Sequence, residues 1–253
     1  MMFKKVVIHF NRRSFFMRGK LIVIEGTDCS GKETQARLLA KKLNESGIKA
    51  QHLSFPNYGT ATGKIIGSCY LGREELCRDL LKDQDGWFEE GASNVDGLVS
   101  SLYYAADRKY NINKIEELLN QGIHVILDRY TFSNMAHQGG KILTQEERFQ
   151  FFKKIEVLEF DLLSLPKPDL VILLYVPYQV TLKLQENRME AKDQNEKDRN
   201  HIKRAEQTYL ELRALYHFKM IECTSNGKMR AIEAIHEELA STVKQSLQPE
   251  KKA

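Results

Sequence analysis

Short apolar runs alternate along the chain with longer stretches in which apolar residues recur every three to four positions. The runs predict strands, and five stand out: Leu21–Glu25, Ala50–Phe55, His124–Asp128, Leu170–Val176 and Met220–Thr224. The first, third and fourth are nearly continuous in Val, Ile and Leu, which is typical of strands covered on both faces. This alternation predicts an α/β fold with a five-stranded parallel sheet and helices on both faces.

The longer stretches carry helix signals. In chain order the predicted helices cover Lys32–Ser46, about 95–120, Thr144 to about Leu163, Ile202–Leu215 and Arg230–Leu247. The first ends at Gly47 and the second at Gly122, because glycine readily takes the left-handed conformation that closes a helix. Thr144 and Glu147 have the spacing of a capping box, which predicts a helix start there.

We interpret residues 18–247 as one domain with an unusual segment, about 186–204. This segment is dense in charges of both signs and nearly free of apolar residues. It is either a solvated helix–turn–helix or a mobile lid over a bound ligand. The polar end of the chain, residues 248–253, is expected to be a flexible tail.

Composition places the chain among ordinary globular proteins. Its 253 residues are 42% hydrophobic and 28% charged, which allows a sizeable core. The net charge of +4 does not by itself indicate a nucleic acid partner, and it also suits a protein that handles phosphates. No apolar run approaches the length of a membrane span, so no membrane partner is expected. The four cysteines form no C-x-x-C pair, which favours a reduced, cytoplasmic protein.

The start of the chain is interpreted separately. The first twenty residues contain six basic side chains and no acidic one. That composition resembles an organellar transit segment. The interpretation we prefer is that residues 1–17 are an N-terminal extension, disordered or preceding a true start at Met17.

The most specific motif lies where the first predicted strand meets the first predicted helix. The chain has the pattern Gly-x-x-x-x-Gly-Lys there, which is that of a phosphate-binding P-loop. Glycines let the backbone approach phosphates closely, and the loop N–H groups and helix N-terminus direct positive partial charge at them. The residues expected to bind a nucleotide are Gly26, Thr27, Asp28, Cys29, Ser30, Gly31, Lys32, Glu33 and Thr34.

A second charged pair follows the third predicted strand, at the sheet edge where parallel sheets bind ligands. Asp128 can orient Mg²⁺ or its waters, and Arg129 can grip a phosphate with two hydrogen bonds. Two phosphate-binding centres at neighbouring strand ends indicate a donor site and an acceptor site. They predict a kinase acting on a small phosphorylated substrate rather than a hydrolase.

With these motifs in place, the chain resembles the thymidylate kinases of the P-loop nucleoside monophosphate kinase group. The segments that carry the resemblance are Ile24–Lys32, Phe55-Pro56 with Thr62-Gly63, Tyr104–Arg108, Asp128–Tyr130 with Ser133–Ala136, and Pro166–Leu170. The match is collinear from about Lys20 to Leu247. It implies a P-loop NTPase-type three-layer sandwich, with ATP bound at the P-loop. It also suggests a homodimer that uses the apolar faces of the helices at 95–120 and 144–163.

The resemblance assigns roles around the acceptor. Tyr104 matches the aromatic that stacks on thymine, Arg108 the arginine that donates to a thymine carbonyl, and Asn134 a residue that pairs with the thymine edge. His137 takes the place of an aromatic that crowds out a ribose 2′-hydroxyl. Asp28 matches the acid near the sugar 3′-hydroxyl. The expected substrate-binding set is Asp28, Phe55, Tyr104, Arg108, Arg129, Asn134 and His137.

The chain departs from the family pattern at its metal site and at one acceptor contact. Glu33 replaces the hydroxyl that normally contacts Mg²⁺. Either Glu33 binds the ion, or Thr34 supplies a hydroxyl, or the metal is held mainly by ATP, water and Asp128. Tyr58 stands where some members have an arginine for the acceptor phosphate, so that contact is weaker or is supplied elsewhere.

A further departure concerns the catalytic arginine. Cys29 stands where some members place that arginine inside the loop. Members without it resemble a second group, in which the lid supplies the arginine. The expected catalytic residues are therefore Lys32, Arg129 and two lid arginines, Arg188 and Arg199.

The predicted reaction transfers the γ-phosphoryl group of ATP, bound with Mg²⁺, to dTMP and gives dTDP and ADP. No covalent enzyme intermediate is needed, because positioning and charge stabilisation suffice for phosphoryl transfer. Two alternatives stay open: a kinase for another pyrimidine monophosphate, and a nucleotide-binding paralogue with weak catalysis. Glu33 is the best support for the second.

Overall fold

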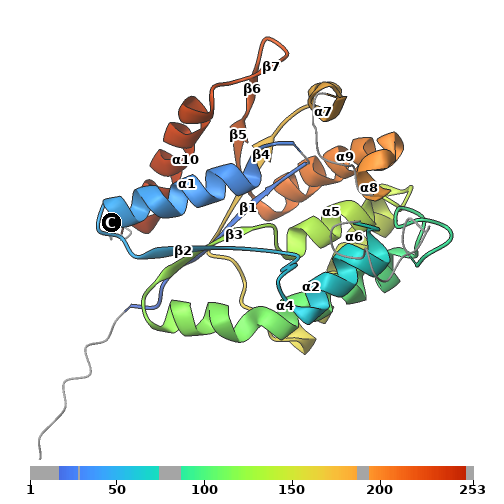
Figure 1. Ribbon diagram of the computed structural model, residues 1–253, viewed down its shortest axis with the longest axis horizontal. Helices are drawn as coiled ribbons and strands as arrows, with labels where there is room; N and C mark the ends of the chain where they lie inside the picture. The colour runs from blue at the N-terminus through green and yellow to red at the C-terminus, as the bar shows by residue number, and fades with distance from the viewer. Residues whose placement is uncertain (1–16, 28, 74–86, 187–193, 249–253) are drawn as a thin grey trace, which may run out of the picture.

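A parallel sheet forms the centre of the molecule (Figure 1). The computed structural model describes residues 17–27, 29–73, 87–186 and 194–248. Its strands are β1 (Leu21–Gly26), β2 (Ala50–Ser54), β3 (His124–Asp128), β4 (Leu170–Tyr175) and β5 (Lys219–Glu222), all parallel, in the order β2-β3-β1-β4-β5. The predicted five-stranded parallel sheet is confirmed.

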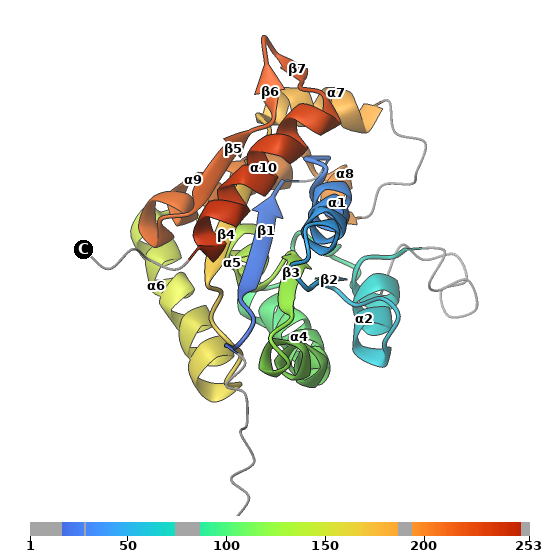
Figure 2. The same ribbon diagram turned by 90° about the vertical axis from the view of Figure 1, so that its left-hand side faces the viewer.

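The strand bounds differ from the predicted ones by one or two residues, except for β3, which matches. The last strand was predicted to run to Thr224 but ends at Glu222. Thr224 belongs to a small antiparallel hairpin, in which β6 (Thr224–Ser225) pairs with β7 (Lys228–Met229). Both views show this hairpin projecting beyond the end of the sheet (Figures 1 and 2).

All five predicted helices are present, together with shorter ones that the sequence pattern did not indicate. The helices are α1 (Lys32–Glu45), α2 (Ala61–Ile65), η1 (Ile66–Tyr70), α4 (Gly97–Asn120), α5 (Thr131–Gly139), α6 (Gln145–Glu156), η2 (Val157–Leu162), α7 (Tyr178–Glu186), α8 (Gln194–Lys197), α9 (Arg199–Tyr216) and α10 (Ile232–Leu247). Both η elements are π-helical. The helix predicted from Thr144 to Leu163 is α6 continued by η2.

The start of α6 differs in detail from a capping box. The Oγ1 atom of Thr144 accepts a hydrogen bond from the backbone N–H of Glu147, as expected. The Glu147 carboxylate does not reach back to the Thr144 backbone; it accepts a hydrogen bond from the Thr144 hydroxyl itself, at 2.6 Å. The cap is therefore a local hydroxyl–carboxylate pair.

Helices cover the sheet on both faces. The side chains of Ile22 and Ile24 in β1 pack with α1 and α10 on one face. Leu21 and Val23 point to the other face, where they pack with α4, and further along that face β4 packs with α5, α6 and α9. The alternation along β1 thus feeds two cores, which gives the predicted three layers (Figure 1).

The division into residues 1–17, 18–247 and 248–253 stays a prediction. Apart from Met17 and Gln248, the extension and the tail lie outside the described residues, and so do residues 187–193 of the expected lid. Among the residues that the structure describes, no helix is long and apolar enough to cross a membrane.

Candidate active site

The P-loop joins the central strand to the first helix. A Cβ atom on Gly26 would lie 2.5 Å from the carbonyl oxygen of Leu174 and 2.8 Å from Oγ of Ser30, so no larger residue fits there. Gly31 has a φ of 79°, a left-handed value that glycine adopts at little cost. Both glycines of the motif are therefore required by the backbone. Asp28 lies outside the described residues.

Lys32 folds back over this loop. Its Nζ donates hydrogen bonds to the carbonyl oxygen of Thr27 at 2.6 Å and to Oγ of Ser30 at 3.3 Å, and its side chain is almost fully buried. Cys29 has a φ of 60° and contributes a left-handed turn to the loop. The ammonium group is held against the loop, close to where loop N–H groups bind phosphates in such motifs.

Two carboxylates lie beside the P-loop. The Oδ1 atom of Asp128, at the end of β3, is buried and has no hydrogen-bond partner among the described residues. Glu33 is exposed in the first turn of α1, and Thr34 beside it is half-buried. Burial lowers the pKa of His52, and the charges of Asp128 and Glu33 oppose this shift, so both carboxylates lie near one imidazole.

This arrangement fits Mg²⁺ better than a metal held by protein alone. Within the described ranges, no group of three His, Cys, Asp or Glu side chains is placed to hold a metal ion. Mg²⁺ is commonly bound through one or two carboxylates, with phosphate and water oxygens as its other ligands. The unpartnered oxygen of Asp128 is a suitable donor for it.

Arg129 sits in a strained backbone position directly after β3. Its φ is 64°, which is uncommon for a residue with a side chain and is often found at functional sites. The Nη1 atom lies 3.3 Å from Oγ of Ser133, 3.4 Å from the hydroxyl of Tyr209 and 3.3 Å from Nε2 of His137. It also reaches the carbonyl oxygen of Gly26 at 3.5 Å. The guanidinium therefore lies between the P-loop and α5.

Glu25 supports Arg129 indirectly, because both side chains contact the hydroxyl of Ser133. The sequence analysis did not identify this residue. Its buried carboxylate accepts hydrogen bonds from the backbone N–H of Tyr130 at 3.0 Å and from the N–H and hydroxyl of Ser133 at 3.1 and 2.6 Å. The Tyr209 hydroxyl adds a fourth bond, at 3.2 Å. Burial raises the pKa of Glu25, although the hydrogen bonds and the charge of Arg129 oppose the shift. The one sequence feature that could have identified Glu25 is that it is an acidic residue inside an otherwise apolar strand.

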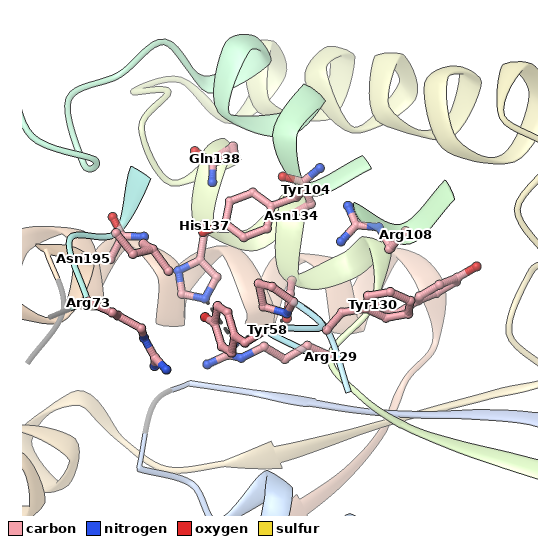
Figure 3. A pocket seen from close by; sticks show the side chains of 14 residues that line it. Tyr58, Arg73, Tyr104, Arg108, Arg129, Tyr130, Asn134, His137, Gln138 and Asn195 are labelled. Atoms are coloured by element: carbon pink, nitrogen blue, oxygen red, sulfur yellow. Dashed lines mark hydrogen bonds between the residues drawn. The ribbon is translucent and has the colours of Figure 1, made fainter. Parts of the chain in front are cut away.

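A cavity of about 110 Å³ opens between α4, α5 and the loop after β2 (Figure 3). It brings together all the expected substrate-binding residues except Asp28. It is lined by Phe55, Pro56, Tyr58, Leu71, Arg73, Tyr104, Arg108, Arg129, Tyr130, Ser133, Asn134, His137, Gln138 and Asn195. Residues from five separate parts of the chain thus converge on one site beside the P-loop.

One wall of the cavity contains a buried ion pair. Arg108 and Glu159 are both fully buried, with Nε and Nη2 of the arginine 2.5 and 2.6 Å from the two carboxylate oxygens. Thr131 and Asn134 also donate to this carboxylate, at 2.9 and 3.0 Å. Burial lowers the pKa of Arg108, but the charge and hydrogen bonds of Glu159 outweigh this effect, so the pKa is raised overall. Glu159 was not anticipated.

The ion pair orients the amide of Asn134. Its Nδ2 atom donates to Glu159 and to the carbonyl oxygen of Ser101, at 3.0 and 3.3 Å. Its Oδ1 atom is buried and has no hydrogen-bond partner among the described residues, and the same holds for Oε1 of Gln138. The cavity therefore offers buried acceptors, which suit a ligand with an N–H group at its edge.

Aromatic side chains complete the cavity. Tyr104 is half-buried and meets the ring of Tyr70 edge to face, with centroids 5.8 Å apart. Phe55 and Tyr130 are 6.1 Å apart on another side. Such flat, firmly packed rings are suitable platforms for a planar base.

His137 does not stand alone, because a second histidine packs on it. His201, buried near the start of α9, lies with its Nε2 atom 3.1 Å from Nδ1 of His137, and the two rings are stacked at 5.3 Å. No local pattern predicts this pair, since the two residues are 64 positions apart in the chain. The pair joins α5 to α9.

Of the two expected lid arginines, the structure describes only Arg199, and its position differs from the expected one. Arg199 is exposed at the start of α9 and pairs with Glu186 at 3.7 Å. It is not among the residues that line the cavity. Arg188 lies outside the described residues. Asn195 of α8, from the same segment, does line the cavity and was not predicted.

Comparisons with known proteins agree with this geometry. A family model described as thymidylate kinase matches residues 24–239. The thymidylate kinase of Homo sapiens is 31% identical over 228 residues, which cover 88% of each chain. That of Schizosaccharomyces pombe is 38% identical over 159 residues, 63% of this chain and 62% of the other. A solved structure of the Candida albicans thymidylate kinase aligns with a TM-score of 0.63 and 26% identity, covering 90% of this chain and 92% of that one. The chain belongs to the thymidylate kinase family.

Proposed function

We propose that the protein transfers the γ-phosphoryl group of ATP to dTMP, giving dTDP and ADP. The observation that carries this proposal is the cavity beside the P-loop. It combines fixed acceptor atoms for a base at one end with Arg129 at the end nearest the P-loop. A donor site and an acceptor site are thereby adjacent, which direct transfer between two bound nucleotides requires.

The base would bind against α4 and α5. Tyr104 provides a stacking surface, and Oδ1 of Asn134 accepts the N3–H of thymine. Nε and Nη2 of Arg108 are engaged by Glu159, which leaves Nη1 to donate to a thymine carbonyl. His137, held by His201, would lie against the sugar and disfavour a ribose 2′-hydroxyl.

The phosphates would meet between the P-loop and Arg129. Lys32 and the loop N–H groups hold the donor phosphates, and Arg129 holds the acceptor phosphate. The strained backbone at Arg129 fixes its direction before substrate arrives, so little ordering is needed on binding. Positioning and positive charge together account for catalysis without a covalent intermediate.

Mg²⁺ is the cofactor we propose, with Asp128 and Glu33 as the residues that would hold it or its waters. When bound, the ion neutralises phosphate charge and orients the donor. Asp128 is the stronger candidate, because its buried Oδ1 atom has no hydrogen-bond partner in the described part of the chain.

The lid arginines Arg188 and Arg199 remain our candidates for charge neutralisation during transfer. Arg199 is exposed, and its ion pair with Glu186 lies at the surface, where it costs little to break. We also propose that the protein is a homodimer, cytoplasmic in location. The proposal of a homodimer is supported by exposed apolar side chains along α4.

A panel of nucleoside monophosphates tests the proposal. ADP release with ATP is measured for dTMP, dUMP, UMP, dCMP and dGMP, each with Mg²⁺ and with Mn²⁺. We expect kcat/KM to be highest for dTMP and K32A to remove nearly all activity without unfolding the protein. A preference for another pyrimidine monophosphate would overturn the substrate assignment. ADP release that no monophosphate stimulates would overturn the kinase assignment.

A further inference from the structure

Arg73 shares the cavity with Arg129, although no motif in the sequence marks it. Its Cζ atom lies 4.6 Å from the centre of the Tyr58 ring, so the guanidinium is placed over the ring face. Both side chains line the cavity. In Figure 3 the guanidinium groups of Arg73 and Arg129 lie on the side of the cavity nearest the P-loop ribbon. Two arginines are thus present where the acceptor phosphate would lie.

The backbone directs Arg73 to this place. η1 ends at Tyr70, and Gly72, two residues later, has a φ of 63° and turns the chain sharply. The N–H of Gly72 donates to the carbonyl oxygen of Ser68 at 3.0 Å, and the N–H of Arg73 donates to that of Gly67 at 2.9 Å. These bonds satisfy the last carbonyl groups of a π-helical turn, so the direction in which Arg73 leaves the helix is defined by the fold.

The helix itself is firmly anchored. Tyr70, in its last turn, is fully buried, and its hydroxyl lies 2.9 Å from both the carbonyl oxygen of Ala92 and the hydroxyl of Ser100. Ile66 and Leu71 are buried in the same small core. Arg73 therefore extends from a rigid base, which is a condition for a side chain that positions substrate.

We propose that Arg73, stacked on Tyr58, is a second arginine for the acceptor phosphate. A nucleoside monophosphate carries close to two negative charges at neutral pH, and Arg129 supplies one positive charge. Stacking engages the face of the guanidinium, whereas its N–H donors lie in its plane and can bind phosphate oxygens. Tyr58 thus acts as a platform that limits the rotamers of Arg73. The inference rests on the proposed function only in taking a nucleoside monophosphate as acceptor.

The test compares binding of dTMP with binding of thymidine, which has the same base and sugar but no phosphate. Dissociation constants are measured by calorimetry for the full-length wild type, R73A, R73K and Y58L. We expect R73A to weaken dTMP binding roughly 10- to 100-fold, the usual effect of losing a charge-assisted contact, and to leave thymidine binding unchanged within about twofold. R73K keeps the positive charge but not the planar guanidinium group, so we expect it to recover only part of the lost dTMP affinity. Y58L is expected to weaken dTMP selectively, by less than R73A.

A control variant makes the result specific. R213A removes an exposed arginine from the far part of α9 and is expected to bind both dTMP and thymidine as the wild type does. Equal losses for dTMP and thymidine in R73A would show a structural role and overturn the proposal, as would unchanged dTMP binding. If the wild type prefers another monophosphate, the same comparison is made with that monophosphate and its nucleoside. Failure of the proposed dTMP specificity can thereby be distinguished from failure of the role proposed for Arg73.

Discussion

Glu25 is an acid near the end of a buried, apolar strand, and its four hydrogen bonds explain why it is there. Two of its partners are backbone N–H groups at the start of α5, where a negative charge is favoured by the helix dipole. Another is Ser133, whose hydroxyl also lies beside Arg129. One carboxylate therefore connects the P-loop strand to the residue that we expect to hold the acceptor.

We expect E25A to lose both stability and substrate binding. Two buried N–H groups lose their partner, which costs about 1–3 kcal/mol in the free energy of unfolding. Arg129 loses its support through Ser133, so KM for dTMP rises more than KM for ATP. Urea denaturation and steady-state kinetics measure the two effects. E25Q, which keeps one acceptor oxygen for the amides, should recover most of the stability; equal instability in both variants would contradict this account.

Residues of the site differ in how far the sequence could predict them. Gly26, Lys32 and Arg129 follow from spacing, because a P-loop and a strand end are local patterns. Arg108 and Asn134 were assigned by family resemblance, but the carboxylate that orients both, Glu159, lies 51 and 25 positions away along the chain. Such a pairing depends on how helices pack, and no local signal encodes it.

At the scale of elements, the long amphipathic helices and buried strands were predictable and the short helices were not. α5 shows why: eight of its nine residues are buried, so no polar face marks its period. η1 and η2 were missed as π-helices because their wider turns leave almost no trace in spacing. α5 contributes Ser133, Asn134, His137 and Gln138 to the cavity, so this wall of the site was the harder part to predict from the sequence.

The segment at 186–204 yields a prediction about turnover. If a lid arginine neutralises charge in the transition state, R188A or R199A lowers kcat more than it raises KM for dTMP. Steady-state kinetics for each variant provide the measurement. R213A, further along α9, serves as the matched surface control. Unchanged kcat in both lid variants would remove these arginines from the mechanism.

Lys141, just after α5, gives a prediction about pH. Its Nζ donates to the carbonyl oxygens of Val95 and Ala92 at 2.6 and 3.1 Å and to the hydroxyl of Ser100 at 3.2 Å. Burial lowers its pKa from 10.5 to about 8; Asp96 opposes the shift and Arg204 adds to it. The unfolded chain therefore holds the proton more tightly than the folded protein does between about pH 8 and 10.5.

The sign follows from this difference in proton binding. The free energy of unfolding should rise with pH across that window for the wild type, relative to K141M, which has no titrating group there. Urea denaturation of both proteins at pH 7.5, 8.5 and 10 gives the comparison. The subtraction removes other groups that titrate in the same range. Parallel stability profiles for the two proteins would show that the ammonium is not penalised by its surroundings.

For the whole molecule, the surface of α4 indicates a partner. One face of this helix is buried in the core, and the other exposes large apolar side chains at helical spacing: Leu98, Val99, Leu102, Tyr103 and Tyr110, which are 36–64% exposed. Val157 and Leu162 of η2 are also exposed. An apolar stripe of this kind is typical of a protein interface, and it supports the homodimer we propose.

We therefore expect the protein to be a dimer in solution and L102D to be a monomer, because a buried, unpaired carboxylate is costly in an apolar interface. Analytical ultracentrifugation at several concentrations measures this. L143D is the control, since Leu143 is 86% exposed but lies in the turn before α6, away from the stripe. A monomeric wild type, or a dimeric L102D, would contradict the assignment.

The strand order has a consequence for how such an enzyme can diverge. β1 and β3, which are followed by the P-loop and by Arg129, are hydrogen-bonded neighbours about 4.8 Å apart, so the sheet sets the spacing between the two sites that we propose for the phosphates. The site that we propose for the base, in contrast, is lined by side chains from helices and loops outside the sheet. Mutations can therefore retune which nucleotide is accepted while the reacting distance is inherited unchanged. Selectivity and chemistry are separately evolvable in this architecture.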